Sequence, residues 1–159
     1  MGLFTPKISR QQLESVKTLL KQAAESSNLV NSTVKPDVFF GRLGFLLDIL
    51  LELQKYEKYK IFSGSSPSSD FKKLIQGLDK TVDAFINRSL NANKEKIEKL
   101  KTQSAKEKNY KNFVAELYHA FLASKSFWPG NLMYPHYTGP LYSETNLAKV
   151  KSLYEETLK

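Results

Sequence analysis

The sequence predicts an all-α protein, a four- to five-helix bundle with one long helix and an irregular aromatic C-terminal segment. Apolar residues recur at steps of three and four along most of the chain, which is typical of helices that bury one face. Capping residues precede these periodic segments, and no alternation long enough for a β-strand occurs. We expect a single helical domain over residues 1–159, with helices over about 9–28, 36–60, 67–103, 105–126 and 143–158.

The first expected helix, residues 9–28, has a clear start signal. Ser9 and Gln12 have the spacing of a capping box, in which each side chain accepts a hydrogen bond from a free backbone amide at the helix start. Four apolar residues share a stripe that we expect to face the core: Leu13, Val16, Leu20 and Ala23. The polar residues that follow Asn28 are expected to end this helix.

Residues 36–60 predict the central helix of the bundle. Pro36 suits the first position of a helix, where its missing N–H is not needed. One apolar face has residues at steps of four and three: Phe39, Leu43, Leu46, Leu50 and Leu53. A second apolar stripe contains Phe40, Leu47 and Leu51, and a third contains Phe45, Ile49 and Tyr56. Only a narrow strip, including Asp48 and Glu52, is polar. A helix that is apolar over most of its circumference must be surrounded by other elements.

The helix over residues 67–103 is the long one, because Ser66 and Pro67 mark its start and apolar residues continue to Leu100. Unbroken, it would span roughly 50 Å at the usual rise per residue, with residues 91–93 as its weakest point. Ser104 and Glu107 match a capping box for the next helix. The buried side of that helix is expected to contain Tyr110, Phe113, Val114, Leu117, Phe121 and Leu122. The inward face of the last helix is expected to contain Leu147, Val150, Tyr154 and Leu158.

Composition excludes several classes of site. The chain has no cysteine, so disulfides, thiolate metal sites and cysteine nucleophiles are excluded. We find no apolar N-terminal segment long enough for a signal peptide, and the run from Phe45 to Leu53 is too short to cross a bilayer. We therefore expect a soluble cytoplasmic protein without membrane contact. The net charge of +8 comes mainly from lysine, which suits nonspecific phosphate contact better than base readout.

A lysine cluster over residues 94–111 is the first candidate site. It contains Lys94, Lys96, Lys99, Lys101, Lys106, Lys108 and Lys111. Only three glutamates offset these lysines, so the segment has a charge of +4, half of the protein's net charge. The functional interpretation is a nucleic-acid-binding face. The alternative, which the interleaved acids favour, is a solvated helix face with intrahelical pairs such as Glu95 with Lys99.

The aromatic segment, residues 127–142, is the second candidate. We expect Trp128, Tyr134, His136 and Tyr137 to form a protein-binding patch, because aromatic side chains supply large contact areas. The alternative is a strap whose rings pack over the open end of the bundle. That alternative is favoured for Trp128 and for Tyr142, which lie next to helices, and it stays open for the other three residues.

Evidence for catalysis is weak. His119 lies on the polar side of its helix and is interpreted as a surface residue. Asp48 is interpreted as half of a structural ion pair. Two histidines without metal-ligand spacing do not make a metal site, so we expect no metal and no cofactor. Gly41 and Gly44 match the GxxG clamp of KH domains, but they lie inside a helical pattern, where they are expected to allow close helix packing.

Three segments carry a resemblance: PDVFFGRLGFLLDILLELQKYEKYKIFSGSSPSSDFKKL, VDAFINRSL and KIEKLKT. The pattern resembles small helical proteins of phages and mobile elements of Gram-positive bacteria, over about residues 28–115. The resemblance implies a helical fold and a mobile-element origin, and it transfers no functional residue. The stable bundle, the aromatic segment and the lack of active-site chemistry favour a non-catalytic protein-binding module acting on another protein. The resemblance implies a concrete form for it, an inhibitor of a bacterial defence system such as an anti-CRISPR. The alternative is a nonspecific nucleic-acid-binding protein that uses the lysine cluster.

Overall fold

The computed structural model describes residues 6–126, 137 and 139–159. Its elements in chain order are α1 (Arg10–Ser32), α2 (Pro36–Gln54), the short 3-10 helix η2 (Glu57–Tyr59), α3 (Pro67–Gln76), α4 (Leu78–Glu98), α5 (Gln103–Ser126) and α6 (Glu144–Thr157). No β-strand occurs in these residues, which confirms the all-α class. The described chain contains six α-helices rather than four to five.

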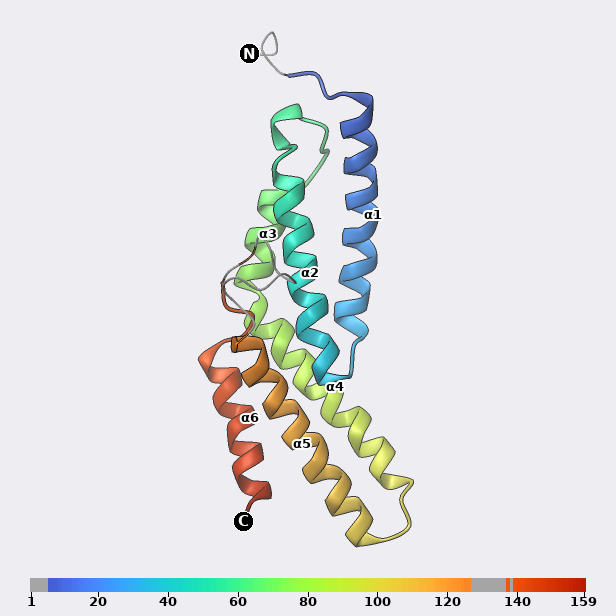
Figure 1. Ribbon diagram of the computed structural model, residues 1–159, viewed down its shortest axis with the longest axis vertical. Helices are drawn as coiled ribbons and strands as arrows, with labels where there is room; N and C mark the ends of the chain where they lie inside the picture. The colour runs from blue at the N-terminus through green and yellow to red at the C-terminus, as the bar shows by residue number, and fades with distance from the viewer. Residues whose placement is uncertain (1–5, 127–136, 138) are drawn as a thin grey trace.

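The helices form two groups of three along an elongated molecule (Figure 1). In one group, α1 and α3 pack against α2. In the other, α5 lies between α4 and α6 and contacts both. The contact between α2 and α5 joins the two groups, so α2 is the central helix that its apolar circumference predicts.

Aromatic rings pack together where α2 meets α4 and α5. The rings of Phe39 and Phe85 stack with centroids 4.0 Å apart, and Phe40 meets Phe121 edge-on at 4.9 Å. Burying each such side chain stabilises the fold by about 1.5–3 kcal/mol. Phe45 is the exception to the prediction for α2, because 50% of its surface is exposed.

The predicted long helix over residues 67–103 is wrong, because Gly77 divides it into α3 and α4. Gly77 leaves the helical conformation with φ −96° and ψ 4°, and its backbone N–H bonds to the carbonyls of Lys73 and Ile75. A Cβ at this position would lie 3.2 Å from the Lys73 carbonyl oxygen, so glycine suits the bend. The expected weak point at residues 91–93 stays helical, and the Asn93 amide donates to Asn109 Oδ1 at 3.0 Å.

Most predicted helix starts are confirmed. The Ser9–Gln12 capping box forms in both directions, and Pro36 and Pro67 begin their helices. The capping box at Ser104 is wrong: α5 begins at Gln103, and the Ala105 amide donates to Thr102 Oγ1 at 3.1 Å.

Helix ends differ more from the prediction. The first helix continues to Ser32 instead of ending at residue 28, and α2 ends at Gln54, followed by a turn and η2 instead of helix to residue 60. Four residues expected on buried faces are exposed instead: Leu20, Tyr110, Leu122 and Leu158. Within the described residues, no helix combines the length and the apolar character needed to cross a membrane.

Candidate functional site

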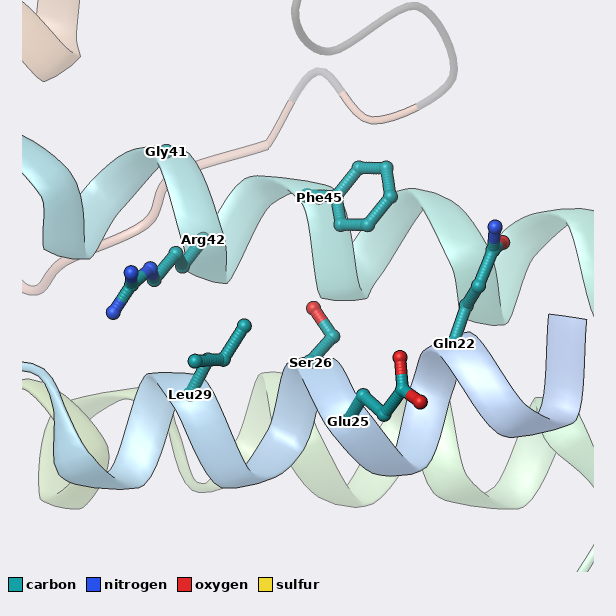
Figure 2. Close-up of a pocket in the computed structure, with 7 residues that line it drawn as sticks. All are labelled: Gln22, Glu25, Ser26, Leu29, Gly41, Arg42 and Phe45. Atoms are coloured by element: carbon teal, nitrogen blue, oxygen red, sulfur yellow. The ribbon is translucent and has the colours of Figure 1, made fainter.

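An open pocket between α1 and α2 is a candidate site that sequence reasoning missed. It has a volume of about 620 Å³. Its lining is Gln22, Glu25, Ser26 and Leu29 from α1 with Gly41, Arg42 and Phe45 from α2 (Figure 2). We call it the α1–α2 pocket.

The pocket exposes two large apolar side chains. Leu29 keeps 44% and Phe45 keeps 50% of its surface in contact with solvent, although both lie beside well-buried neighbours. Moving the apolar side chains of such residues out of water lowers the free energy, so a partner that covers them is stabilised. The only sequence signal was that Phe45 belongs to a helix with more apolar residues than one face requires.

Opposite charges flank this apolar surface. In Figure 2, the Arg42 guanidinium lies near one end of the pocket, and Glu25 lies toward the other. Arg42 Nη1 donates to Thr33 Oγ1 at 2.7 Å, which holds the arginine side chain at its end of the pocket. In the part of the chain that the structure describes, Glu25 forms no salt bridge. The pocket therefore presents a positive and a negative group on either side of its apolar surface.

The lysine cluster occupies the hairpin formed by the end of α4, the connection and the start of α5. We call residues 94–111 the lysine hairpin. It projects beyond the other helices at the lower end of the view in Figure 1. Six of the seven lysines are exposed, and Lys106 is half-buried. None of the seven forms a salt bridge within the described residues, so the pairing of Glu95 with Lys99 does not occur.

The aromatic segment is described only in part. Trp128, Tyr134 and His136 lie outside the described residues. Tyr137 packs in the core with 7% of its surface exposed, its ring 5.9 Å from that of Phe71. Its hydroxyl donates to the Pro140 carbonyl at 2.9 Å, and burial raises the pKa of Tyr137 to about 12. The structure therefore does not present Tyr137 as a partner-binding surface.

Tyr142, at the end of the aromatic segment, follows the predicted packing role. Its ring lies 5.1 Å from that of Phe121 and 5.8 Å from that of Phe40. Burial, together with the nearby Glu144 carboxylate, raises the pKa of the Tyr142 hydroxyl. This residue covers the junction between α2 and α5 as the strap interpretation requires.

The remaining titratable candidates lie on different helices. His119 is exposed on α5, with its ring 5.9 Å from that of Tyr154, which confirms its interpretation as a surface residue. Asp48 is buried on α2 with 6% of its surface exposed. Among the described residues, no group of three or more histidine, aspartate or glutamate side chains has the arrangement to hold a metal ion. The GxxG glycines lie inside α2, and Gly44 is buried.

Comparison of the chain with protein-family models, with curated proteins and with solved structures finds no match. The geometry of the α1–α2 pocket and of the lysine hairpin therefore supports the functional proposals.

Proposed function

We propose that the protein is a non-catalytic protein-binding module that docks an amphipathic helix of its partner in the α1–α2 pocket. The observation that carries the proposal is the pair of exposed apolar side chains, Leu29 and Phe45, in one open pocket. A helix that inserts its apolar face into such a pocket removes both side chains from water, and the apolar residues of the partner would recur at steps of three and four.

The open shape favours a helix over a small molecule. Small-molecule sites usually enclose most of the ligand surface. Here the lining residues Leu29 and Phe45 are about half exposed, so a small ligand would keep much of its own surface in water. A helix lying along α1 and α2 would instead cover these residues and the rim together.

The charges specify the chemistry of the partner. A partner helix that fits the pocket carries an acidic residue near Arg42 and a basic residue near Glu25, on either side of its apolar anchors. Complementary charges of this kind fix the direction of the helix and exclude its reverse orientation. The proposed occupant is therefore an amphipathic helix with an apolar stripe, one acidic end and one basic end.

The resemblance to phage and mobile-element proteins suggests the biological form of this activity. We propose an inhibitor that blocks a bacterial defence protein by binding to it, and an inhibitor of this kind needs no catalytic residue. Trp128, Tyr134 and His136 are proposed as further partner contacts. Expression in a strain with an active CRISPR system would test the inhibitor: plasmid interference should fall, and unchanged interference would remove the anti-CRISPR form of the proposal.

The pocket itself is tested by selection and matched substitution. A displayed library of helical peptides is selected against the whole protein, and the affinities of the selected peptides are measured by anisotropy. Leu29→Ser and Phe45→Ser should each weaken binding at least 10-fold, since buried apolar anchors at interfaces contribute about 2 kcal/mol or more.

Leu20→Ser is the matched control, because Leu20 is also on α1 and is also 44% exposed, but it does not line the pocket. It should leave the affinity unchanged. The proposal fails if no helical peptide is selected, or if Leu20→Ser weakens binding as much as Leu29→Ser does.

A further inference from the structure

We infer that the lysine hairpin and Tyr110 together form a second binding site, which takes single-stranded nucleic acid. This site shares no residue with the α1–α2 pocket, so it does not depend on the proposed function. Three features of the described residues support this site: lysines without salt bridges, an exposed tyrosine beside them, and carboxylates around that tyrosine.

The lysines are available for phosphate groups. Because none of them is held by a carboxylate in the described structure, binding a phosphate breaks no existing ion pair. They come from three adjacent stretches of a projecting hairpin: Lys94 and Lys96 from α4, Lys99 and Lys101 from the connection, and Lys106, Lys108 and Lys111 from α5. A flexible phosphate backbone can follow such a surface, and each neutralised phosphate adds to the affinity at low salt.

Tyr110 supplies the aromatic surface that a polyanion site alone lacks. It was expected in the core, but 37% of its surface is exposed. It lines a recess of about 250 Å³ together with Lys111 of α5 and with Leu153 and Thr157 of α6. Its position four residues after Lys106 places both side chains on the same side of α5. An exposed tyrosine among lysines is the combination on which unpaired bases stack.

Two carboxylates determine which part of a nucleotide can enter the recess. Glu107 and Glu156 also line the recess, and their negative charge disfavours a phosphate there. A base is neutral, so it can enter the recess while its phosphates lie along the lysines outside. The carboxylates therefore separate the base position from the backbone position.

The same features disfavour a duplex and a membrane as the ligand. The bases of a duplex are stacked on one another, so Tyr110 gains nothing from duplex binding. A membrane-binding surface combines basic residues with apolar side chains that insert into the bilayer. Within residues 94–111, Tyr110 is the only exposed large hydrophobic side chain that the structure describes.

The test measures binding of fluorescein-labelled oligothymidylate by anisotropy over a range of salt concentrations. In a single-strand complex, each phosphate contact contributes about 0.7 to the magnitude of the slope of log K against log salt. The triple variant Lys96→Gln, Lys99→Gln and Lys101→Gln should therefore reduce the slope by about 2, while a triple variant of exposed lysines elsewhere, Lys17→Gln, Lys21→Gln and Lys72→Gln, should leave it nearly unchanged.

Tyr110 is tested separately. Tyr110→Leu should weaken binding to the single strand at least about 5-fold, the lower end of what stacking on one base contributes, and Tyr110→Phe should retain the affinity. Circular dichroism checks that each variant is folded. If Tyr110→Leu does not fold, the comparison of the two lysine triples with each other still decides the lysine part.

Three results would overturn the inference. The first is equal loss of affinity in the two lysine triples, which would show only a net-charge effect. The second is tighter binding to a duplex of the same length than to the single strand. The third is binding to phosphatidylserine vesicles without binding to oligothymidylate, which would assign the hairpin to a membrane. Leu29→Ser should have no effect on any of these measurements, so this test is independent of the α1–α2 pocket.

Discussion

Arg88 of α4 is expected to fasten the end of α1 to the rest of the bundle. Its Nε donates to the Thr33 carbonyl at 2.9 Å, and its Nη2 donates to the Val30 carbonyl at 3.0 Å. Carbonyls in the last turn of a helix have no partner within the helix. The last turn of α1 contains no basic residue of its own, so Arg88 supplies the positive charge that a helix C-terminus favours.

The expected cost of Arg88→Ala follows from these contacts. A hydrogen bond to a charged group contributes about 1.5–3 kcal/mol, and the helix dipole adds about 0.3–1 kcal/mol. Arg88 is only partly buried, so water can replace part of both bonds in the variant. The two bonds and the dipole together sum to at least about 3 kcal/mol, and because water replaces part of this in the variant, we expect the free energy of unfolding to fall by about 2–3 kcal/mol. Burial lowers the pKa of Arg88, but the guanidinium stays charged at neutral pH.

The measurement is urea denaturation followed by far-ultraviolet circular dichroism. Arg88→Lys should give an intermediate loss, because lysine keeps the charge without the planar fork that reaches two carbonyls. Arg10→Ala is the control, since it removes the same side chain from an exposed position at the start of α1. A loss below about 0.5 kcal/mol for Arg88→Ala, which is the usual effect of a surface substitution, would refute this reasoning.

Three further predictions concern the C-terminal part of the chain. Tyr137 should ionise near pH 12 in an ultraviolet titration that follows the tyrosinate. Because the pKa in the folded protein lies above the usual 10.0, the contribution of Tyr137 to the free energy of unfolding is complete below pH 10 and is lost as the pH rises toward 12. Gly139→Ala should lower the melting temperature, because the new Cβ would lie 2.6 Å from the Tyr137 hydroxyl, whereas Gly64→Ala would meet no atom within 4 Å and should be affected only by its positive φ. Asp79→Ala should loosen α6, because Asn146 Nδ2 donates to Asp79 Oδ1 at 2.8 Å. Amide hydrogen exchange should then become faster in α6 and stay unchanged in α1. Equal protection of α6 in the variant and in the unchanged protein would contradict this role.

The helices and most of their starts could be predicted because the signals are local. Ser9 bonds to Gln12 only three residues away, and a proline at the first position of a helix needs no distant partner. The division at Gly77 could not be predicted in this way. One glycine costs a helix only about 1 kcal/mol, so the apolar pattern continues through it, and the packing of α3 and α4 decides whether the helix bends.

Neither candidate site could be read fully from the sequence. The apolar pattern identified Phe45 as a member of a crowded helix, but which side of α2 stays uncovered depends on where α1, α3 and α5 pack. The position of Leu29 beside it depends on the antiparallel arrangement of α1 and α2. The charge of the lysine hairpin was evident, whereas the lack of salt bridges to other described residues and the exposure of Tyr110 are properties of the folded hairpin.

The position of the core makes it possible to test the two proposed sites without unfolding the protein. The rings of Phe39 on α2 and Phe85 on α4 stack between the two groups of helices. The α1–α2 pocket is lined by two helices of the first group, and the lysine hairpin lies at the far end of the second (Figure 1). Substitutions at Leu29 or at Lys99 remove exposed side chains and leave the central packing intact, so a loss of binding in either variant reports on the surface and not on the fold.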